Sequence, residues 1–533
     1  MLWKTNSRFQ ELYYKTLSAA YRTYPVQSLK HSGRISFELD RVYVLPHLVS
    51  KPLEQVSTGL VNLERSELPS LCIWDFLAKL NQEPAYRKIL LLGGPGTGKT
   101  LLLEYLTLVY AQGNQRQAQE KVPKLIPILL YLRQIRKLIL NNEQITLAEV
   151  TSIILKREFS LKLDASTNWF EQKLNLGKCL VMLDGLDEVR DPRERRIVRD
   201  WLDEQLELYP KNCHIISARP CGYLDYPLKT TTISLELQGY NSQQIEKFLQ
   251  NFYFEEHLLQ QAHQNDNLLK QKARKRALQL NNLIKNVPTL TFLASSPLLL
   301  TFITAFAQNS DSILKKRLEL YGGICELLLT TRPKAKGIPT LYNLDSTQVQ
   351  LILQKLALEL MRREQTQFTL AEGLEIISQP FSNLVVAPQA PAQFLQYIED
   401  ITGLLQRVST KLYQFIHLSF QEYLAAAEIK HTNQEQILID KIDHPWWSET
   451  IRLYSACSDT SQIVIAAWNR RSVITMSLAY DCWQEGQTVN PQLKQRLENW
   501  LDAALESSDP EIANLAAKVH LSRRLQYYAV ASD

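Results

Sequence analysis

The stretch Gly93-Gly94-Pro95-Gly96-Thr97-Gly98-Lys99-Thr100 decides the fold of this chain, because it matches the pattern G-x-x-x-x-G-K-[ST] in full. An apolar run precedes it at residues 89–92, and a second apolar run follows at residues 101–103. This order predicts a strand, a glycine-rich loop and the start of a helix, which is the context that a phosphate-binding loop requires. We therefore expect this loop to bind a nucleoside triphosphate together with Mg²⁺.

The residue types in this loop suit phosphate chemistry. Glycines allow backbone N–H groups to turn toward phosphate oxygens without a Cβ in the way. Lys99 can reach the β- and γ-phosphates, the Thr100 hydroxyl can hold Mg²⁺, and the positive end of the following helix attracts the anion. We expect the nucleotide to contact Gly93, Gly94, Pro95, Gly96, Thr97, Gly98, Lys99, Thr100 and Leu101.

An acidic partner for this loop lies in the segment Leu180-Val181-Met182-Leu183-Asp184-Gly185-Leu186-Asp187-Glu188. Four apolar residues place Asp184 at the carboxyl end of a predicted strand, where ligands bind in open α/β sheets. Asp184 is expected to hold Mg²⁺ with Thr100. Asp187 or Glu188 is expected to orient or deprotonate the attacking water.

The next predicted strand ends before Arg219, in the sequence Ile215-Ile216-Ser217-Ala218-Arg219-Pro220. An arginine at this position can sense the γ-phosphate through a charge-assisted contact, although an isolated arginine is more often a surface residue. Lys99, Asp184, Asp187, Glu188 and Arg219 are thus the expected catalytic residues. The five arginines between residues 190 and 199 are expected to coat a solvated helix instead. The absence of an N-K-x-D motif favours adenine over guanine.

Length and composition predict an ordinary globular protein with several cores. The chain has 533 residues, of which 45% are hydrophobic and 22% charged. The net charge of +5 is weak evidence for nucleic-acid binding and does not exclude it. No run of 18 apolar residues and no apolar signal core at the N-terminus occur, so we expect a soluble, cytoplasmic protein without a membrane partner.

The pattern of elements predicts an α/β fold. Apolar strands at residues 89–92, 125–130, 179–183, 214–217 and 231–235 alternate with helices, which predicts a mostly parallel sheet with helices on both faces. We divide the chain into five parts: an N-terminal helical lead-in at 1–85, a nucleotide-binding domain at 86–240, a helical domain at 241–330, a winged-helix domain at 331–430 and a C-terminal helical region at 431–533.

Several smaller elements follow from local sequence. In the winged-helix domain, helices are expected near residues 346–362, 369–378 and 391–402, before a hairpin of residues 404–408 and 412–416. Other expectations are helices at residues 9–21 and 66–82, an extended segment at 41–46 that a proline ends, and a linker at 332–339.

Four motifs in this order resemble those of NACHT-domain proteins, the branch of P-loop ATPases that includes animal NOD-like receptors and bacterial antiphage relatives. They are the glycine loop, the acidic box 184–188, the segment 217–220 and the box Phe415-Ile416-His417-Leu418-Ser419-Phe420-Gln421-Glu422-Tyr423-Leu424-Ala425-Ala426. The sequence Ser295-Ser296-Pro297-Leu298-Leu299-Leu300 also resembles the family's Asn-Pro-Leu-Leu box, with Ser296 in place of asparagine. The resemblance covers residues 40 to 430.

The resemblance implies further roles. Pro297 would pack near adenine, as would the segment Arg41–Pro46 with Val44, and His417 would touch the bound diphosphate. ADP would then hold a closed monomer, and exchange for ATP, triggered by a ligand, would open it into a homo-oligomer with slow ATPase activity. The family's bacterial members commonly act in antiphage defence, so a phage-derived ligand is one candidate. The chain departs from the family in having no long repeat sensor at its C-terminus.

Two other functions stay open. A winged helix can bind DNA under the control of ATP, but the expected recognition helix at residues 391–400 contains no Arg or Lys for phosphate contacts. The basic stretch at residues 270–276 is expected to be a solvated helix face. A remodelling motor of the AAA type is the third possibility, and continuous unstimulated turnover of ATP would distinguish it from a switch.

Overall fold

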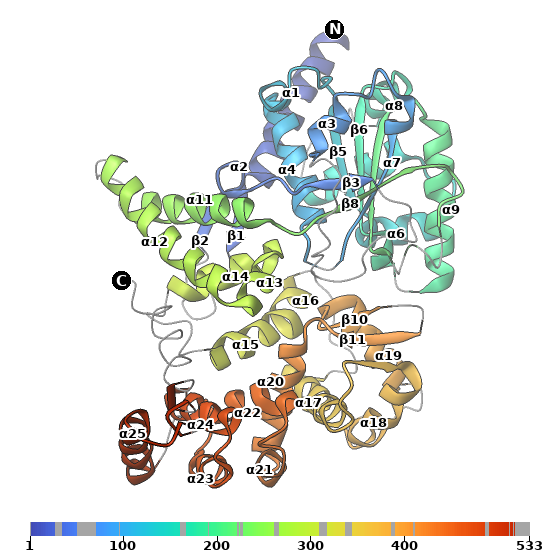
Figure 1. Cartoon of the computed structure of the whole chain (residues 1–533). Helices are drawn as coiled ribbons and strands as arrows, with labels where there is room; N and C mark the ends of the chain where they lie inside the picture. Colours follow the sequence, from blue (N-terminus) through green and yellow to red (C-terminus); the bar gives the residue numbers. More distant parts are fainter. Residues whose placement is uncertain are drawn as a thin grey trace. The chain divides into compact units, whose positions relative to one another are not determined.

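The computed structural model describes residues 2–26, 35–50, 71–94, 96–159, 167–189, 191–220, 223, 227–260, 266–308, 317–335, 344–384, 390–408, 411–485, 490–510, 512–514 and 516–517. The chain divides into two compact units, Met1–Ala305 and Phe306–Asp533, and each unit is described by itself. Figure 1 shows both units, with most of their elements labelled.

A six-stranded sheet in the order β3-β8-β4-β7-β6-β5 forms the centre of the first unit. Neighbouring strands from β8 to β5 are parallel, and only β3 pairs antiparallel, with β8. The sheet therefore confirms the predicted α/β class, with an antiparallel edge that the sequence did not indicate. The strands are β3 (Leu48–Ser50), β4 (Lys88–Leu92), β5 (Ile126–Tyr131), β6 (Cys179–Asp184), β7 (Cys213–Ala218) and β8 (Ile233–Leu237).

Helices cover both faces of this sheet because alternate strand residues point to opposite faces. Leu90 and Leu92 pack with one group of helices, whereas Ile89 and Leu91 pack with the other. The first face carries α6 (Leu132–Asn141), α7 (Leu147–Phe159), α8 (Thr167–Asn175) and α9 (Pro192–Leu208). The second face carries α3 (Ile73–Leu77) and α4 (Lys99–Gln112), and α5 (Gln115–Ala118) follows α4.

Helix α1 (Leu2–Tyr21) packs beside α4 (Figure 1), and its Tyr13 side chain reaches the edge strand β5. The Tyr13 hydroxyl donates to the Pro127 carbonyl over 2.6 Å. Proline has no N–H to donate, so it suits an edge strand, and an edge strand needs covering. Phe9 and Tyr13 also pack against the rings of Trp169 and Phe170 in α8. The predicted helix at 9–21 is therefore present, and it belongs to the core of the sheet domain.

The segment before the sheet differs from the prediction. Residues 41–46 are not extended throughout, because α2 (Leu39–Val42) makes one helical turn before the chain extends toward β3. Leu39 and Val42 are both buried, and their spacing of three places them on one helical face. Strands β1 (Thr23–Val26) and β2 (Ile35–Glu38) form a hairpin ahead of it. The helix predicted at 66–82 is shorter, since α3 begins at Ile73, and residues 51–70 lie outside the described ones.

Helices follow β8 in the segment that the sequence assigned to a helical domain. They are α11 (Ser242–Gln260), α12 (Asp266–Asn286), α13 (Pro288–Ala294) and α14 (Pro297–Gln308), and the short helix α13 among them was not predicted. Helices α11 and α12 pack along each other, and Arg276 of α12 lies over the Tyr253 ring of α11. The basic stretch of α12 is otherwise exposed at Lys270, Lys272, Arg274 and Lys275.

The second unit contains the predicted winged helix. Its elements are α17 (Ser346–Arg362), β9 (Gln367–Thr369), α18 (Leu370–Ser382), α19 (Ala390–Tyr397), β10 (Leu405–Arg407), β11 (Leu412–Phe415) and α20 (Leu418–His431). The hairpin of β10 and β11 gains a third strand, β9, which the sequence did not indicate. Phe368, Phe381 and Phe394 are fully buried in its core.

The remaining elements of this unit are helical. Helices α15 (Arg317–Glu326) and α16 (Arg332–Ala335) precede the winged helix, so the start of the predicted linker at 332–339 is wrong. A π-helical turn, Leu327–Thr331, lies between α15 and α16. Its three leucines are buried, and it carries the helical backbone into residues 332–335. After α20 come α21 (Gln436–Asp440), α22 (Ser448–Ser455), α23 (Ser461–Arg470), α24 (Val473–Glu485) and α25 (Pro491–Leu505). Among the described residues, no helix has the length and apolar character needed to cross a membrane.

Candidate nucleotide-binding site

The glycine loop joins the end of β4 at Leu92 to the start of α4 at Lys99. Gly98 has a φ of 96°, a left-handed conformation that disfavours residues with a Cβ. A Cβ on Gly93 would lie 2.8 Å from Thr97 Oγ1, so this position also requires glycine. The Thr97 hydroxyl closes the loop by donating to the Gly94 carbonyl over 2.9 Å. Pro95 lies outside the described residues.

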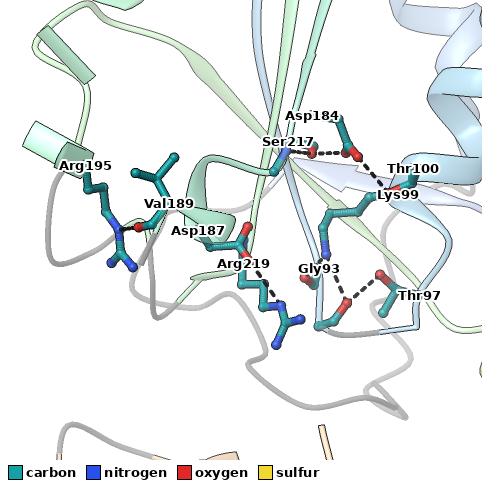
Figure 2. A network of polar contacts seen from close by, with 12 residues as sticks. Gly93, Thr97, Lys99, Thr100, Asp184, Asp187, Val189, Arg195, Ser217 and Arg219 are labelled. Carbon is teal, nitrogen blue, oxygen red and sulfur yellow. Dashed lines mark hydrogen bonds and ion pairs between the residues drawn. The ribbon is translucent and has the colours of Figure 1, made fainter. Parts of the chain in front are cut away.

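Lys99 folds back onto this loop (Figure 2). Its Nζ donates to the carbonyls of Gly93, at 2.5 Å, and Gly94, at 3.0 Å. The ammonium group therefore lies against the backbone that is expected to cradle phosphate. Leu101, in the first turn of α4, is partly buried.

Asp184 joins three elements at the carboxyl end of the sheet (Figure 2). It is 2% exposed, and it accepts hydrogen bonds from Thr100 Oγ1 at 2.8 Å and from Ser217 Oγ at 2.5 Å. Ser217 in turn accepts a hydrogen bond from the Gly185 N–H over 2.9 Å. Gly185 has a φ of 83°, which accounts for a glycine directly after the acid. Sequence reasoning brought Thr100 and Asp184 together but assigned no role to Ser217.

These residues fit a magnesium ion bound with a nucleotide. A hydroxyl and a carboxylate are hard oxygen ligands, and Mg²⁺ in nucleotide sites typically takes one or two protein ligands besides phosphate and water. Thr100 and Asp184 supply such a pair next to a lysine, and the glycine loop adds phosphate-binding N–H groups.

Asp187 and Arg219 are partners of each other. One carboxylate oxygen of Asp187 accepts from the Arg219 backbone N–H over 3.0 Å, and the other lies 3.0 Å from Arg219 Nε. Both side chains are mostly buried, with 10% and 13% exposure. The two residues to which the sequence gave separate roles thus form one charge-assisted pair. The backbone of Glu188 lies in the same short 3-10 turn, Leu186–Glu188.

Arg195 corrects one expectation. It was assigned to a solvated helix face, yet it is 6% exposed and its Nε donates to the Val189 carbonyl over 2.7 Å (Figure 2). Val189 follows the acidic box directly, so Arg195 braces the turn that carries Asp187.

The neighbouring arginines Arg193 and Arg196 are exposed as predicted. The Arg199 side chain, in contrast, is 14% exposed and pairs with Asp200, and Arg190 lies outside the described residues. The spacing of charged residues alone could not separate these cases.

The segment 295–297 lies against the glycine loop, as the role predicted for Pro297 requires. Ser296 Oγ donates to the Gly96 carbonyl over 3.2 Å, and Pro297 Cγ would lie 3.7 Å from a Cβ on Gly98. Ser296, which replaces the family's asparagine, therefore still makes a polar contact with the loop. Whether Pro297 contacts adenine stays a prediction.

Val44 joins this group through Tyr240, which sequence reasoning missed. The Tyr240 hydroxyl donates to the Val44 carbonyl over 2.5 Å, and its backbone N–H donates to the Ser295 carbonyl over 2.8 Å. Tyr240 follows the last strand of the sheet, and its position beyond that strand is the only signal in the sequence. These contacts connect the segment before the sheet with the helical domain beside the loop.

His417 belongs to the second unit, where it caps the N-terminus of α20. Its Nδ1 accepts from the Ser419 N–H over 3.2 Å and lies 2.8 Å from Ser419 Oγ. Partial burial lowers the pKa of His417, so the ring is neutral near pH 7. With Nδ1 used as an acceptor, Nε2 carries the remaining proton. Its predicted contact with the diphosphate stays a prediction.

Two family models match the chain. The NACHT domain matches residues 87–257, and the winged helix-turn-helix domain C-terminal to NACHT matches residues 317–429. With the glycine loop and the Thr100–Asp184 pair, these matches define a P-loop NTPase. The chain belongs to the NACHT-domain P-loop NTPases.

Solved structures give only distant likenesses. Cdc6p from Pyrobaculum aerophilum is 12% identical over 67% of this chain and 92% of that chain, with a TM-score of 0.22. A chain in the structure of Drosophila ORC bound to DNA is 13% identical over 77% of this chain and 98% of that chain, with a TM-score of 0.21. At such low TM-scores neither likeness bears on function. No curated protein matches the chain.

Proposed function

We propose that this protein is a nucleotide-driven signalling switch that binds ADP or ATP with Mg²⁺ and hydrolyses ATP slowly. The observation that carries the proposal is the arrangement of Lys99, Thr100 and Asp184 around one loop. The NACHT and winged-helix matches support the extension from a nucleotide site to a switch. We place the protein in the cytoplasm, where both nucleotides are available.

Each residue of the site would have its own role in ATP hydrolysis. Lys99 would exchange its contacts with loop carbonyls for phosphate oxygens, and Thr100 with Asp184 would hold Mg²⁺, which neutralises charge on the phosphates. Asp187 or Glu188 would orient water. To contact a γ-phosphate, Arg219 would have to weaken or break its ion pair with Asp187. The state of this ion pair would then differ between bound ADP and bound ATP.

His417 is the residue we propose as the latch between nucleotide and winged helix. Its neutral ring can donate to an anion through Nε2, while Ser419 fixes the ring through Nδ1. ADP would favour a closed monomer through this contact. A ligand, for which phage-derived molecules are candidates in antiphage defence, would favour ATP and assembly of a homo-oligomer.

Native mass by light scattering tests the switch. We expect wild-type protein with ADP to be monomeric, and His417→Ala with a non-hydrolysable ATP analogue to assemble without ligand. His431→Ala, an exposed histidine of α20, is the matched control and should stay monomeric. A monomeric His417→Ala protein in every nucleotide state would contradict the latch.

The same preparations separate the alternatives. Fast unstimulated ATP turnover would favour a remodelling motor. A salt-dependent shift with duplex DNA would favour a DNA-binding regulator, although helix α19 (Ala390–Tyr397) carries no Arg or Lys.

A further inference from the structure

Helix α4 is tied to the carboxyl edge of the sheet by two side-chain hydrogen bonds. Thr100 Oγ1 donates to Asp184 at 2.8 Å, and the Tyr131 hydroxyl donates to Glu104 at 2.8 Å. Thr100 and Glu104 are four residues apart, so they share one face of the helix. Tyr131 is the register partner of Asp184 in the pairing of β5 with β6. The two bonds thus join neighbouring residues of the helix face to neighbouring strand ends.

The N-terminal helix reaches the second of these bonds. Tyr13 of α1 contacts the carbonyl of Pro127 in β5. From Tyr13 to Tyr21 a helix advances about 12 Å, and from Pro127 to Tyr131 a strand advances about 13 Å. These similar advances, together with the hydrogen bond between Tyr21 and Tyr131, place the end of α1 at the end of β5.

Tyr21 lies at this junction. It is partly buried and packs against the apolar clusters on both faces of the sheet. Burial and the Glu104 carboxylate raise its pKa, and a hydrogen bond with Tyr131 opposes the rise. For Tyr131 too, burial, Glu104 and Tyr21 raise the pKa, so both phenols stay protonated and able to donate.

We propose that Tyr21, Tyr131 and Glu104 form a positioning relay through which α1 sets the spacing between Thr100 and Asp184, and hence the affinity for the magnesium–nucleotide pair. The inference rests on the proposed nucleotide site and deepens it. The three residues position the site and do not touch the reacting atoms. Helix α1 is then part of the nucleotide switch, in addition to covering the edge of β5.

The physical basis is the coupling of α4 to two strands at once. A hydroxyl that donates to a carboxylate in a partly buried site makes a charge-assisted hydrogen bond, stronger than one between neutral groups. Without the hydrogen bond from Tyr131, the turn of α4 that carries Glu104 is no longer held at a fixed distance from β5. Thr100 lies one turn earlier in the same helix, so its position is also less well fixed. Coupling is reciprocal, so nucleotide binding must also stabilise the docking of α1.

The test compares the affinity for ADP in Mg²⁺ with that in EDTA, by calorimetry on the full chain. The dissociation constant in EDTA divided by that in Mg²⁺ gives the factor by which magnesium tightens ADP binding, and we call this factor the magnesium ratio. We expect Tyr131→Phe to lower this ratio by about 10-fold, since a hydrogen bond to a charged group is worth about 1.5 kcal/mol or more. Tyr21→Phe should lower it several-fold. Glu104→Gln, which keeps an acceptor for Tyr131, should retain more of the ratio than Glu104→Ala.

Tyr13→Phe is the matched control. It removes a tyrosine hydroxyl from the same helix, and with it the bond to Pro127, so it should lower Tm while leaving the magnesium ratio unchanged. A wild-type ratio in both Tyr21→Phe and Tyr131→Phe would overturn the relay but leave the nucleotide site intact. An equal loss in Tyr13→Phe would reduce the effect to general destabilisation and also overturn it. If the wild-type protein bound no ADP, the proposed function would fail together with the relay.

Discussion

Lys99 donates to two loop carbonyls, Gly93 and Gly94, and phosphate binding would exchange these acceptors for phosphate oxygens. An ammonium group gains more from an anionic acceptor than from a neutral carbonyl. At the scale of single residues, the nucleotide site therefore depends on this one charge more than on any other side chain of the loop.

Lys99→Ala should weaken ADP binding by about 10- to 100-fold, because a hydrogen bond to a charged group is worth about 1.5–3 kcal/mol. Calorimetric titration measures the change. Thr97→Ser, which keeps the hydroxyl that closes the loop, serves as a control and should bind nearly as tightly as the wild type. Unchanged affinity in Lys99→Ala would contradict the site.

Arg219→Gln should reduce the preference for ATP over ADP by about 10-fold, through the loss of a charge-assisted contact with the γ-phosphate. Separate titrations with ADP and a non-hydrolysable ATP analogue give this ratio. If Arg219 only braces Asp187, the substitution will lower Tm and leave the ratio as it was. That result would remove Arg219 from the proposed sensing role.

Because the His214 ring is buried, we expect the protein to lose stability in mild acid. The ring is fully buried on β7, and burial, with Lys88 nearby, lowers its pKa to about 4 from a usual 6.5. The unfolded chain takes up a proton as the pH falls below about 6.5, whereas the folded chain does so only near 4. The free energy of unfolding therefore falls as the pH is lowered from about 6.5 to about 4, by an amount on the order of 3 kcal/mol.

The measurement is the free energy of unfolding in urea between pH 7 and pH 4. His214→Leu should flatten this profile, while His431→Gln, at an exposed position of α20, should leave it unchanged. A profile for His214→Leu as steep as that of the wild type would show that other groups cause the acid sensitivity.

At the scale of elements, Gly373 shows how closely α18 packs against strand β9 and helix α19 of the winged-helix domain. A Cβ at this position of α18 would lie 2.8 Å from Phe368 Cε2 and 3.0 Å from Leu395 Cδ1, both in buried side chains. Alanine gains about 1 kcal/mol in helix propensity over glycine, but overpacking a core costs about 1–3 kcal/mol. Because the clash is with the buried ring of Phe368, we expect the cost of overpacking to exceed the gain in helix propensity.

Gly373→Ala should therefore destabilise the protein by about 1 kcal/mol, which scanning calorimetry would detect as a lower Tm. The far-UV circular dichroism at 20 °C should not change, because the helix itself is not broken. A raised Tm would mean that helix propensity dominates and that the packing around Phe368 yields easily.

The elements also show what local sequence could predict. The parallel strands β4, β5 and β6 were predictable because each is mainly an apolar run bounded by breaks, as buried parallel strands are. Strands β7 and β8 carry polar residues between their apolar ones, and their place in the alternation with helices made them predictable. The short strands β3 and β9 and the turn of α2 were not, since three or four residues carry no readable period. These elements form only because the rest of the sheet or hairpin offers them partners.

The same limit applies to the site. Thr100 and Asp184 could be predicted because strand order places both at one edge of the sheet. Ser217 and Tyr240 could not, because their contacts depend on how β7 and the segment after β8 sit beside their neighbours. Likewise, Arg195 could not be told from the exposed Arg193 and Arg196, because its burial depends on the Val189 carbonyl that it meets in the fold.

At the scale of the whole molecule, the chain joins a nucleotide-binding unit to a unit with a winged helix and a helical C-terminal region. The proposed switch needs the nucleotide to be held long enough to define a state, so the protein should retain ADP through purification. A motor that turns over continuously would not keep its product in this way.

The most direct measurement is the nucleotide that co-purifies with untreated protein, released by denaturation and identified by chromatography. The proposed switch predicts about one ADP per chain in the wild type and a large loss in Lys99→Ala, consistent with the affinity expected for a charge-assisted phosphate contact. An empty wild-type site, together with rapid ATP turnover, would contradict a switch held closed by ADP.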